Sequence, residues 1–503
     1  MNLERLRTVR WGVPAFVLAV AASTRLWGLG HPRALVFDET FYVKDGWSLW
    51  NLGYSATWPG DADAQFAAGS VDGYLASGSY VVHPPLAKWL IGLGMAIGGP
   101  EDPSSWRLAT AIVGILAVML LFLIARHLFH STLLGGIAGL LFAVDGNAIV
   151  MSRVALLDNF LMFFALLGIG AVLLDRGWTQ RRLEDWVLRR RRDGGSLDWG
   201  PVLWWRPWLL AAGLAFGLAS AVKWSGFYFL AVFAVYTLVS DALARRRLGI
   251  LFWGTGTVAR QGPASFVLTV PVALAAHLAT WAGWFTSDGG YGRHWADSAA
   301  NAWSGAFAWV PAPLQSWIHY QAGVYAYHVG ESRDHPYASP AWQWLLMLRP
   351  TSMYYSDDPE GCTVEYCGQS ITGIANPLIW WAATAAVLYL IYRLARYREW
   401  RVGFILVGLV AGYLPWLLYP DRTIYHFYTI AFEPTMILAL TAVIALILRV
   451  GEEPVADPVP RRLLVGGFLV IVIAVSVFFW PLWTGIQVPY EYIRAHWWLP
   501  GWR

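Results

Sequence analysis

Long apolar segments recur along the whole chain, and they constrain its fold more than any other feature. A helix that crosses a bilayer needs about 20 mostly apolar residues, because lipid offers no hydrogen-bond partner to an exposed peptide group. By that measure the sequence predicts about eleven spanning helices, near 11–30, 107–125, 133–150, 156–174, 207–222, 224–241, 264–283, 377–392, 402–419, 430–448 and 463–483. The fold class that follows is an all-α polytopic membrane protein.

The overall composition agrees with this fold class. Hydrophobic residues make up 57% of the chain and charged residues only 14%, whereas soluble domains carry about 25% charged residues. The first apolar segment has no small-residue cleavage site and runs directly into a charged stretch, so we expect a retained helix and not a removed signal peptide. Residues 1–503 are expected to form a single membrane domain.

Arginine clusters between the apolar segments predict the orientation of the chain. With eleven spans, all the clusters lie on one side: Arg5, Arg7 and Arg10; Arg126; Arg181, Arg182 and Arg189 to Arg192; Arg245 to Arg247; Arg393, Arg396, Arg398 and Arg401; Arg461 and Arg462. Positive loops stay in the cytoplasm, so we expect a cytoplasmic N-terminus and an external C-terminus. The expected location is the plasma (inner) membrane.

Two long loops then belong to the extracytoplasmic face, at residues 31–106 and 284–376. Within the first loop, residues 86–98 form an apolar piece that is too short to span the bilayer. We expect it to be a helix that lies in the outer interface.

An acid pair, Asp38 and Glu39, comes directly after the first apolar segment, in a stretch rich in aromatic residues. Carboxylates are rarely buried without partners, so this pair could serve as a general base near the membrane surface. Alternatively, both acids could simply cap a helix that begins near Thr40. The local sequence favours neither interpretation.

Further ionisable residues lie at the predicted outer ends of helices, namely Arg25, Arg107, Arg153, Asp158 and Lys223. Each cation alone could be a side chain that reaches from the membrane to the interface. Five such positions at one depth favour a function, because charge in a bilayer is costly. Cations there would suit the phosphate of a lipid carrier. His83 and Lys88 flank the start of the 86–98 helix, which could equally be an ordinary proline-initiated helix start.

Later segments offer weaker signals. His335, Asn376 and His426 lie in aromatic stretches that could line a sugar or peptide cleft, or could belong to interfacial belts. The sequence contains no P-loop, no zinc-ligand spacing and no serine-nucleophile motif. Cys362 and Cys367 could form a disulfide in an oxidising compartment, or they could be unrelated bystanders.

Taken in order, these motifs resemble the protein O-mannosyltransferases, which are integral-membrane glycosyltransferases of the C type. The resemblance rests on the acid pair, on His83-Pro84-Pro85-Leu86-Ala87-Lys88 and Lys223-Trp224-Ser225-Gly226, on the stretch from His335-Pro336 to Trp344, and on Asn376-Pro377 and Tyr425-His426. It covers nearly the whole chain. It implies the C-type fold with eleven spans, and transfer of mannose from a polyprenyl-phosphate-mannose donor to Ser or Thr hydroxyls of exported proteins by a single inverting displacement.

The resemblance also implies roles for the residues. Asp38 would be the base and Glu39 its support, with the reverse assignment open. Arg107, Lys223 and Arg153 would bind the donor phosphate. Substrate binding or positioning would involve Arg25, His83, Lys88, Asp158, His335, Asn376 and His426. No metal or other cofactor is expected.

One departure from the family concerns the second outer loop. Eukaryotic members carry a β-trefoil MIR domain there, and this loop is too short to hold one. That points to a bacterial member, and the Ala/Gly/Arg/Trp-rich composition points to an actinobacterium. Expected partners are the lipid-linked donor, acceptor proteins during or after export, membrane lipids and the protein-export channel, but no nucleic acid.

Two other functions are compatible with parts of the sequence. A related C-type transferase could move a polyprenyl-phosphate-linked sugar to a lipid or a cell-wall glycan. A transporter is disfavoured, because the charges lie at helix ends and no inverted repeat is visible.

Overall fold

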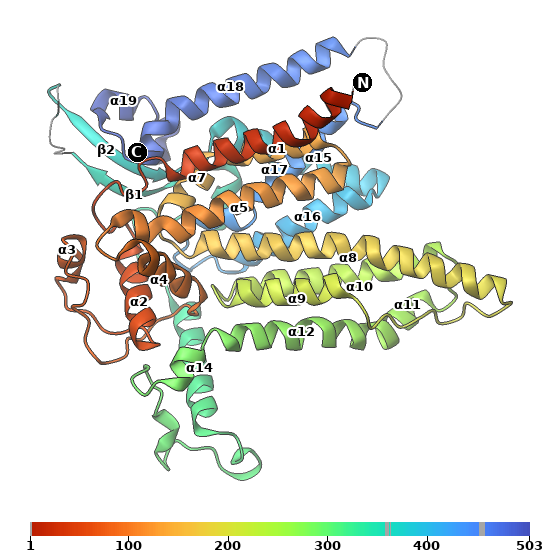
Figure 1. The fold of residues 1–503 in the computed structure, drawn as a ribbon, viewed down its shortest axis with the longest axis horizontal. Coiled ribbons are helices and arrows are strands. Elements are labelled where there is room, and N and C mark those ends of the chain that lie inside the picture. The colour runs from red at the N-terminus through yellow and green to blue at the C-terminus, as the bar shows by residue number, and fades with distance from the viewer. Residues whose placement is uncertain (1–2, 358–361, 363, 452–457) are drawn as a thin grey trace.

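The structure is a computed structural model that describes residues 3–357, 362, 364–451 and 458–503. The side chains of residues 3–9, which include Arg5 and Arg7 of the first arginine cluster, lie outside this description. Long helices run side by side in one bundle (Figure 1). They are α1 (Leu3–Leu26), α5 (Pro103–Phe129), α8 (Asp158–Arg192), α9 (Pro207–Ser220), α10 (Gly226–Arg247), α12 (Gly262–Ala279), α15 (Pro377–Tyr397), α16 (Trp400–Gly412), α17 (Glu433–Ile447) and α18 (Val459–Thr484). The predicted all-α fold is confirmed.

Helix length and apolar composition identify the spans only in part. Among the described residues, six helices are long and apolar enough to cross a membrane, and α6 (Thr132–Val144) with α7 (Gly146–Arg153) makes a seventh if the bent pair is one span. Helices α9, α16 and α17 are apolar but shorter, with 14, 13 and 15 residues. The number of eleven spans therefore remains a prediction.

The single helix predicted over residues 133–150 is wrong, because the chain breaks there into α6 and α7. The two helices are bent by 62°. Asp145 lies at the break, and its carboxylate accepts hydrogen bonds from the backbone N–H groups of Asn147 at 2.9 Å and Ala148 at 3.3 Å. Such a cap satisfies the first N–H groups of α7 and allows a new helix to start in a new direction.

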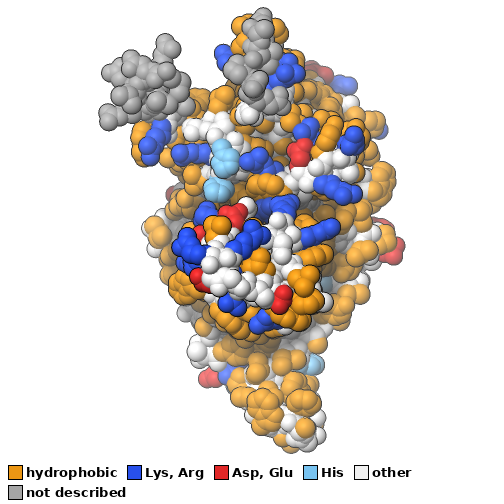
Figure 2. Space-filling model, turned by 90° about the vertical axis from the view of Figure 1, so that its right-hand side faces the viewer, with side chains coloured by type: hydrophobic (Ala, Val, Ile, Leu, Met, Phe, Trp, Pro, Cys, Tyr) orange, Lys and Arg blue, Asp and Glu red, His pale blue; other side chains and the backbone are white. Residues whose placement is uncertain are grey.

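The two ends of the bundle differ in character. Figure 2 shows Lys and Arg side chains gathered over one end, with histidines among them. We call this the arginine-rich end. It includes Arg126 at the end of α5, Arg189 to Arg192 at the end of α8, and Arg245 to Arg247 at the end of α10. Helix α1 begins at this end, and the chain terminates at the opposite end (Figure 1), an arrangement compatible with the predicted odd number of crossings.

The opposite end, the loop end, carries the segments between the long helices. The first loop contributes α2 (Glu39–Leu52), α3 (Ala62–Ala67) and α4 (Leu86–Gly98), and the bounds of α4 match the predicted segment. The second contributes α14 (Ala312–Gly330), which projects away from the bundle (Figure 1).

The described residues contain further short elements. Three are α-helices, α11 (Trp253–Gly256), α13 (Ala282–Thr286) and α19 (Tyr490–Arg494), and three are strands, β1 (Thr351–Ser356), β2 (Cys367–Gly373) and β3 (Val488–Pro489). A π-helical turn lies at Thr257–Gln261, and short 3-10 helices lie at Trp295–Asp297, Gly305–Phe307, Ala341–Leu346, Leu414–Leu418, His426–Ala431 and Pro500–Trp502.

A small antiparallel sheet, with two strands from the second loop and one from the segment after α18, was not predicted. Strand β1 pairs with β2, from Thr351 opposite Gly373 to Ser356 opposite Gln369, and β3 pairs with the other edge of β2. A disulfide joins Cys362 to Cys367. The pairing that the sequence left open is therefore present, and it joins the connection between β1 and β2 to the first residue of β2.

A buried ion triad holds the bundle near the arginine-rich end. Arg206, just before α9, donates to Asp175 of α8 and to Asp241 of α10, with an Nη1–Oδ2 distance of 2.6 Å to Asp241. All three side chains are almost fully buried. One arginine thus satisfies two acids on neighbouring helices, a tertiary link that the sequence did not reveal.

Candidate active site

The start of α2 presents Asp38 at the loop end of the bundle. Asp38 is the residue immediately before α2, but its carboxylate caps no backbone N–H group. Its one recorded partner is the Tyr42 hydroxyl, which donates to Oδ2 over a long 3.4 Å. The carboxylate therefore retains lone pairs for a substrate, and for Asp38 the structure argues against the helix-cap interpretation.

Strained backbone precedes this acid. Phe37 has a φ of 50°, a left-handed conformation that few residues other than glycine adopt. Its ring packs edge-on against Phe427, Tyr425 and His335, with centroid distances of 5.7, 5.9 and 6.4 Å. Strain of this kind persists only where the surroundings impose it, and it gathers at functional sites.

Glu39, the next residue, is in a different state. Its side chain is fully buried and accepts four hydrogen bonds: two from Arg107 at 2.8 Å each, one from the backbone N–H of Ala155 at 2.8 Å, and one from the backbone N–H of Val36 at 2.9 Å. These bonds use both carboxylate oxygens. Glu39 therefore ties the first loop to α5 and to the link between α7 and α8.

Arg107 is equally occupied. Besides Glu39, its guanidinium donates to the carbonyl oxygens of Leu29, Pro32 and Ala34 at 3.2, 3.2 and 2.9 Å. A guanidinium has five N–H groups, and these five contacts account for all of them. In this geometry Arg107 has no donor left for a phosphate.

A cavity of about 210 Å³ is lined by Asp158 and Lys223, the two residues whose charges act on Asp38. Asp38 itself is not part of the lining. The polar lining of the cavity comes from His83, Asp158, Lys223, His328 and Arg422, and its aromatic lining includes Trp224, Trp416 and Tyr428. We call this the Lys223 cavity. It combines a few charged groups with flat apolar surfaces, which is the usual make-up of a small-molecule site.

Two cations supply the positive charge of the Lys223 cavity. The Nζ atom of Lys223 lies 2.7 Å from the Asp158 carboxylate and 4.7 Å from the centre of the Tyr428 ring. Arg422 donates from Nη2 to Nδ1 of His328 at 3.0 Å. Its Nε is buried without a hydrogen-bond partner in the described structure. Both cations therefore keep donors for an anion.

The histidines of the cavity are neutral. Burial, reinforced by the charge of Lys223, holds the pKa of His83 well below its usual value, and burial beside Arg422 lowers the pKa of His328 to about 4. The Nε2 of His328 lies 2.8 Å from the Val82 carbonyl oxygen, so this nitrogen carries the proton and Nδ1 can accept from Arg422. The Nδ1 of His83 is buried, and the described residues offer it no partner.

The environment of Asp38 makes it a better base than an ordinary aspartate. Burial raises its pKa to about 6, the Lys223 charge opposes that shift, and the Asp158 charge adds to it. A base whose pKa lies close to the working pH is suited to proton transfer. The pKa of Tyr42 is raised well above its usual value, mainly by burial, so its hydroxyl remains a donor.

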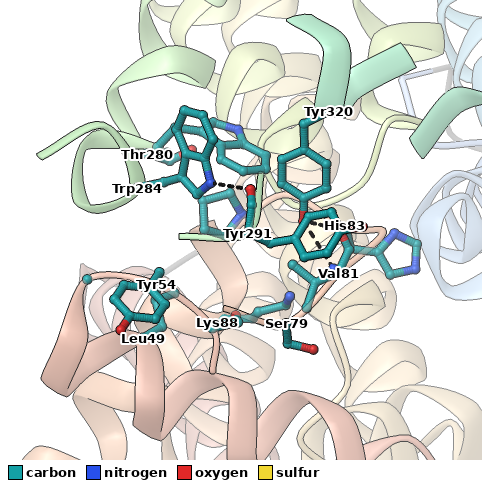
Figure 3. Close-up of a pocket in the computed structure, with 14 residues that line it drawn as sticks. Leu49, Tyr54, Ser79, Val81, His83, Lys88, Thr280, Trp284, Tyr291 and Tyr320 are labelled. Carbon is teal, nitrogen blue, oxygen red and sulfur yellow. Dashed lines mark hydrogen bonds between the residues drawn. The ribbon is translucent and has the colours of Figure 1, made fainter. Parts of the chain in front are cut away.

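Helix α14 braces the segment that carries His83. The Tyr320 hydroxyl donates to the Val81 carbonyl at 2.7 Å and accepts from the Val81 N–H at 3.0 Å (Figure 3). The pocket drawn there has room for about 20 Å³, and Lys88 lies at its wall. Lys88 is paired with Asp45 at 3.0 Å, away from the polar lining of the Lys223 cavity.

The other predicted site residues have structural contacts. Arg153 donates to the carbonyls of Arg25, Trp27 and Gly28, and Arg25 donates to the carbonyls of Phe142 and Ala143. Asn376 caps α15 and binds Val472 and Ser476. His426 is buried against Trp380.

The structure thus brings Asp38, His83, Asp158 and Lys223 together, with His335 behind Phe37. It does not bring Arg25, Arg107, Arg153, Lys88, Asn376 or His426 to the Lys223 cavity. Arg422 was missed, although one signal was present: it is an arginine in a connection on the face that the other clusters avoid. Within the described residues, no group of three His, Cys, Asp or Glu side chains could hold a metal ion.

Two family models match the chain. "Dolichyl-phosphate-mannose-protein mannosyltransferase" covers residues 82–189, and "C-terminal four TMM region of protein-O-mannosyltransferase" covers residues 313–502. The chain is 34% identical to the polyprenol-phosphate-mannose–protein mannosyltransferase of Mycolicibacterium smegmatis, over 99% of this chain and 94% of the relative. It is 31% identical to the Corynebacterium glutamicum protein of the same name, with the same coverage.

Solved structures share the fold. The Saccharomyces cerevisiae protein O-mannosyltransferase Pmt1–Pmt2 complex bound to its sugar donor superposes with a TM-score of 0.75 at 15% identity, over 100% of this chain and 93% of that chain. The Archaeoglobus fulgidus oligosaccharyltransferase with a tethered acceptor peptide superposes with a TM-score of 0.50 at 14% identity, over 94% and 55% of the two chains.

A helical bundle of this kind, with an acid and two cations at the loop end, defines a membrane glycosyltransferase of the C type. The chain belongs to the protein O-mannosyltransferase family, among relatives named polyprenol-phosphate-mannose–protein mannosyltransferases.

Proposed function

We propose that this protein transfers mannose from a polyprenyl-phosphate-mannose donor to Ser or Thr hydroxyls of exported proteins. The names of its full-length relatives support the donor and the protein acceptor. The observation that carries the mechanism is the Asp38 carboxylate, which has one long hydrogen bond and feels the charges of Lys223 and Asp158, two residues that line a cavity with two cations.

The reaction is a single displacement. The Asp38 carboxylate accepts the proton of the acceptor hydroxyl, whose oxygen forms a bond to the anomeric carbon of mannose. The bond from that carbon to the phosphate oxygen breaks on the opposite face, so the configuration inverts. The proton ends on Asp38, and the polyprenyl phosphate leaves with the electron pair.

Lys223 and Arg422 are the proposed ligands of the donor phosphate. They line the same cavity and keep free N–H donors, whereas the donors of Arg107 are used inside the protein and those of Arg153 bind carbonyls. Fixed cations stabilise the charge that develops on a leaving phosphate. We therefore propose that protein cations take the role of a metal ion.

The remaining cavity residues would position these groups. Asp158 orients Lys223 through their 2.7 Å contact, and the open Nδ1 of His83 can accept from a sugar hydroxyl. His335 acts through Phe37, whose ring it touches. Glu39 supports the site by holding the first loop against α5 through Arg107.

The proposed location is the plasma membrane, with the arginine-rich end in the cytoplasm and the loop end outside. The arginine clusters and the β1–β2 hairpin with the Cys362–Cys367 disulfide lie at opposite ends of the bundle (Figure 1). This supports the orientation, because positive loops stay inside and disulfides persist in oxidising compartments. An external site would meet acceptor proteins as they leave the export channel.

The test is transfer of labelled mannose in membranes. Polyprenyl-phosphate-mannose and a Thr/Pro-rich peptide are supplied to the wild type, Asp38→Asn and Glu39→Gln at matched protein levels. Asp61→Asn, an exposed acid of the same loop, is the matched control. Loss of a general base costs about 100- to 10,000-fold, and we expect that loss for Asp38→Asn but not for Asp61→Asn.

Two outcomes would contradict the proposal. If Asp38→Asn transfers mannose at the wild-type rate per folded molecule, Asp38 is not the base. If the wild type uses the donor only when a lipid or glycan acceptor is added, the acceptor is not a protein, and the protein is a C-type transferase of another kind.

A further inference from the structure

A large groove runs along the bundle from its arginine-rich end, and it shares no lining residue with the Lys223 cavity. It has a volume of about 830 Å³ and lies between α5, α8 and α9. Helix α8 packs against both α5 and α9, so it forms the floor, and the other two helices form the walls. The size is in the range of pockets that hold a small organic ligand.

The groove is apolar along most of its length and basic at one end. Its apolar lining includes Leu123 of α5, Leu174 of α8 and Leu214 of α9, and Gly170 of α8 lies on the floor. Arg126, His127 and His130 line the end, where α5 finishes. These three side chains are exposed, and the two histidine rings lie 6.2 Å apart.

The charge of this end is not used inside the protein. Within the described residues, no acid lies within ion-pair distance of Arg126, His127 or His130; the ion pairs of this end involve other arginines. Arg126 and the leucines of the groove therefore offer a cationic surface and an apolar surface side by side. Basic pockets between membrane helices are typical sites for anionic lipid head groups.

We propose that this groove binds one anionic glycerophospholipid. The phosphate of the head group lies at Arg126, His127 and His130, and an acyl chain follows the leucines between α5 and α9. The complementarity of charge and the continuous apolar wall select this ligand over a neutral lipid. The site is separate from the proposed donor site, because the two share no lining residue.

The test uses the purified full-length protein and native mass spectrometry, which counts bound lipids and subunits together. Phosphatidylglycerol and phosphatidylcholine are added in parallel. The head-group variant is Arg126→Gln/His127→Gln/His130→Gln, and Ala211→Trp fills the groove from α9. Arg401→Gln, an exposed arginine of α16 at the same end, is the matched control.

We expect one phosphatidylglycerol to bind the wild type and Arg401→Gln in preference to phosphatidylcholine. The head-group variant should bind it at least about fivefold more weakly, since one basic residue at a membrane surface contributes about that much. Ala211→Trp should lose it. Mannose transfer in detergent serves as the check that each variant is folded.

Three results would overturn the proposal. One is equal retention of phosphatidylglycerol by the wild type and by both groove variants. A second is equal binding of the two lipids by the wild type. The third is a change in the number of subunits in the variants without a change in lipid binding, which would assign the groove to a second copy of the chain.

Discussion

Arg107 holds Glu39 through two hydrogen bonds of 2.8 Å, and both side chains are almost completely removed from solvent. The pair joins α5 to the start of α2, one residue from Asp38. A buried pair of this kind is cooperative, because removal of one partner leaves the other as an uncompensated buried charge. We propose that its main role is to fix the geometry of the neighbouring aspartate.

Arg107→Met is therefore expected to destabilise the protein by roughly 3–5 kcal/mol. The double variant Glu39→Gln/Arg107→Met should recover part of that loss, since it buries no lone charge. The stability of both variants is measured by thermal unfolding of the purified proteins, with size-exclusion chromatography as the readout of the folded fraction. If Arg107→Met keeps wild-type stability and raises only the KM for the lipid donor, Arg107 is a phosphate ligand after all.

The pH dependence of transfer should report Asp38. With a pKa of about 6, the carboxylate is ionised above that pH and protonated below it. Only the ionised form can accept the proton, so kcat/KM should fall about tenfold per unit as the pH drops below about 6, and level off above it. A profile without a transition near 6 would speak against this base.

Lys223→Gln should move that transition to higher pH. The Lys223 charge lowers the pKa of Asp38, so removal of the charge lets the pKa rise further. The residual activity of the variant is measured over the same pH range. Lys44→Gln, whose lysine pairs with Asp63 in the same loop, should leave the midpoint unchanged; an equal shift in both variants would show that the effect is not local.

Arg422→Gln should reduce kcat by about 100- to 1,000-fold, the usual loss when one group that stabilises developing charge is removed. The KM for the acceptor peptide should stay the same, because the proposed contact is with the donor phosphate. Arg333→Gln removes a cation whose side chain is 77% exposed, and it should transfer mannose normally. A matching loss in Arg333→Gln would mean that the effect is one of general surface charge.

The disulfide allows a test of orientation. In intact cells, a membrane-impermeant maleimide should label the protein only after an impermeant reductant has opened the Cys362–Cys367 bond. Cys367→Ser removes the disulfide and leaves the exposed Cys362 as a thiol, so this variant should be labelled without reduction. Labelling of that variant only in inverted vesicles would place the loop end in the cytoplasm.

Much of the fold could be predicted because the bilayer fixes the length of apolar segments. Helices α5 and α18 contain the predicted segments 107–125 and 463–483, and α4 matches its predicted bounds. The break at Asp145 was not visible, since one capping carboxylate hardly changes the hydropathy of a long apolar run. Helix α14 and the β1–β2 hairpin lie in a mixed polar loop, where no periodic apolar pattern marks them.

The site was predictable only where the signal is local. Asp38 follows a helix end and stands among aromatics, and Lys223 interrupts an apolar run, so both are conspicuous. The pairing of Glu39 with Arg107 could not be predicted, because Arg107 is 68 residues away in the chain and contacts Glu39 only in the folded bundle. The same limit applies to Arg422, which gains its place through its contact with His328.

The backbone conformation of Phe37, near the beginning of the chain, depends on contacts with residues near its end. Its left-handed backbone is held by the rings of Tyr425 and Phe427, which the ribosome makes almost four hundred residues later. A nascent chain that has inserted only its first helices thus carries Asp38 without the support that shapes its turn. We therefore expect the arrangement around Asp38 to form only after the segment with Tyr425 and Phe427 has been made and folded, so that a chain still in synthesis does not transfer mannose.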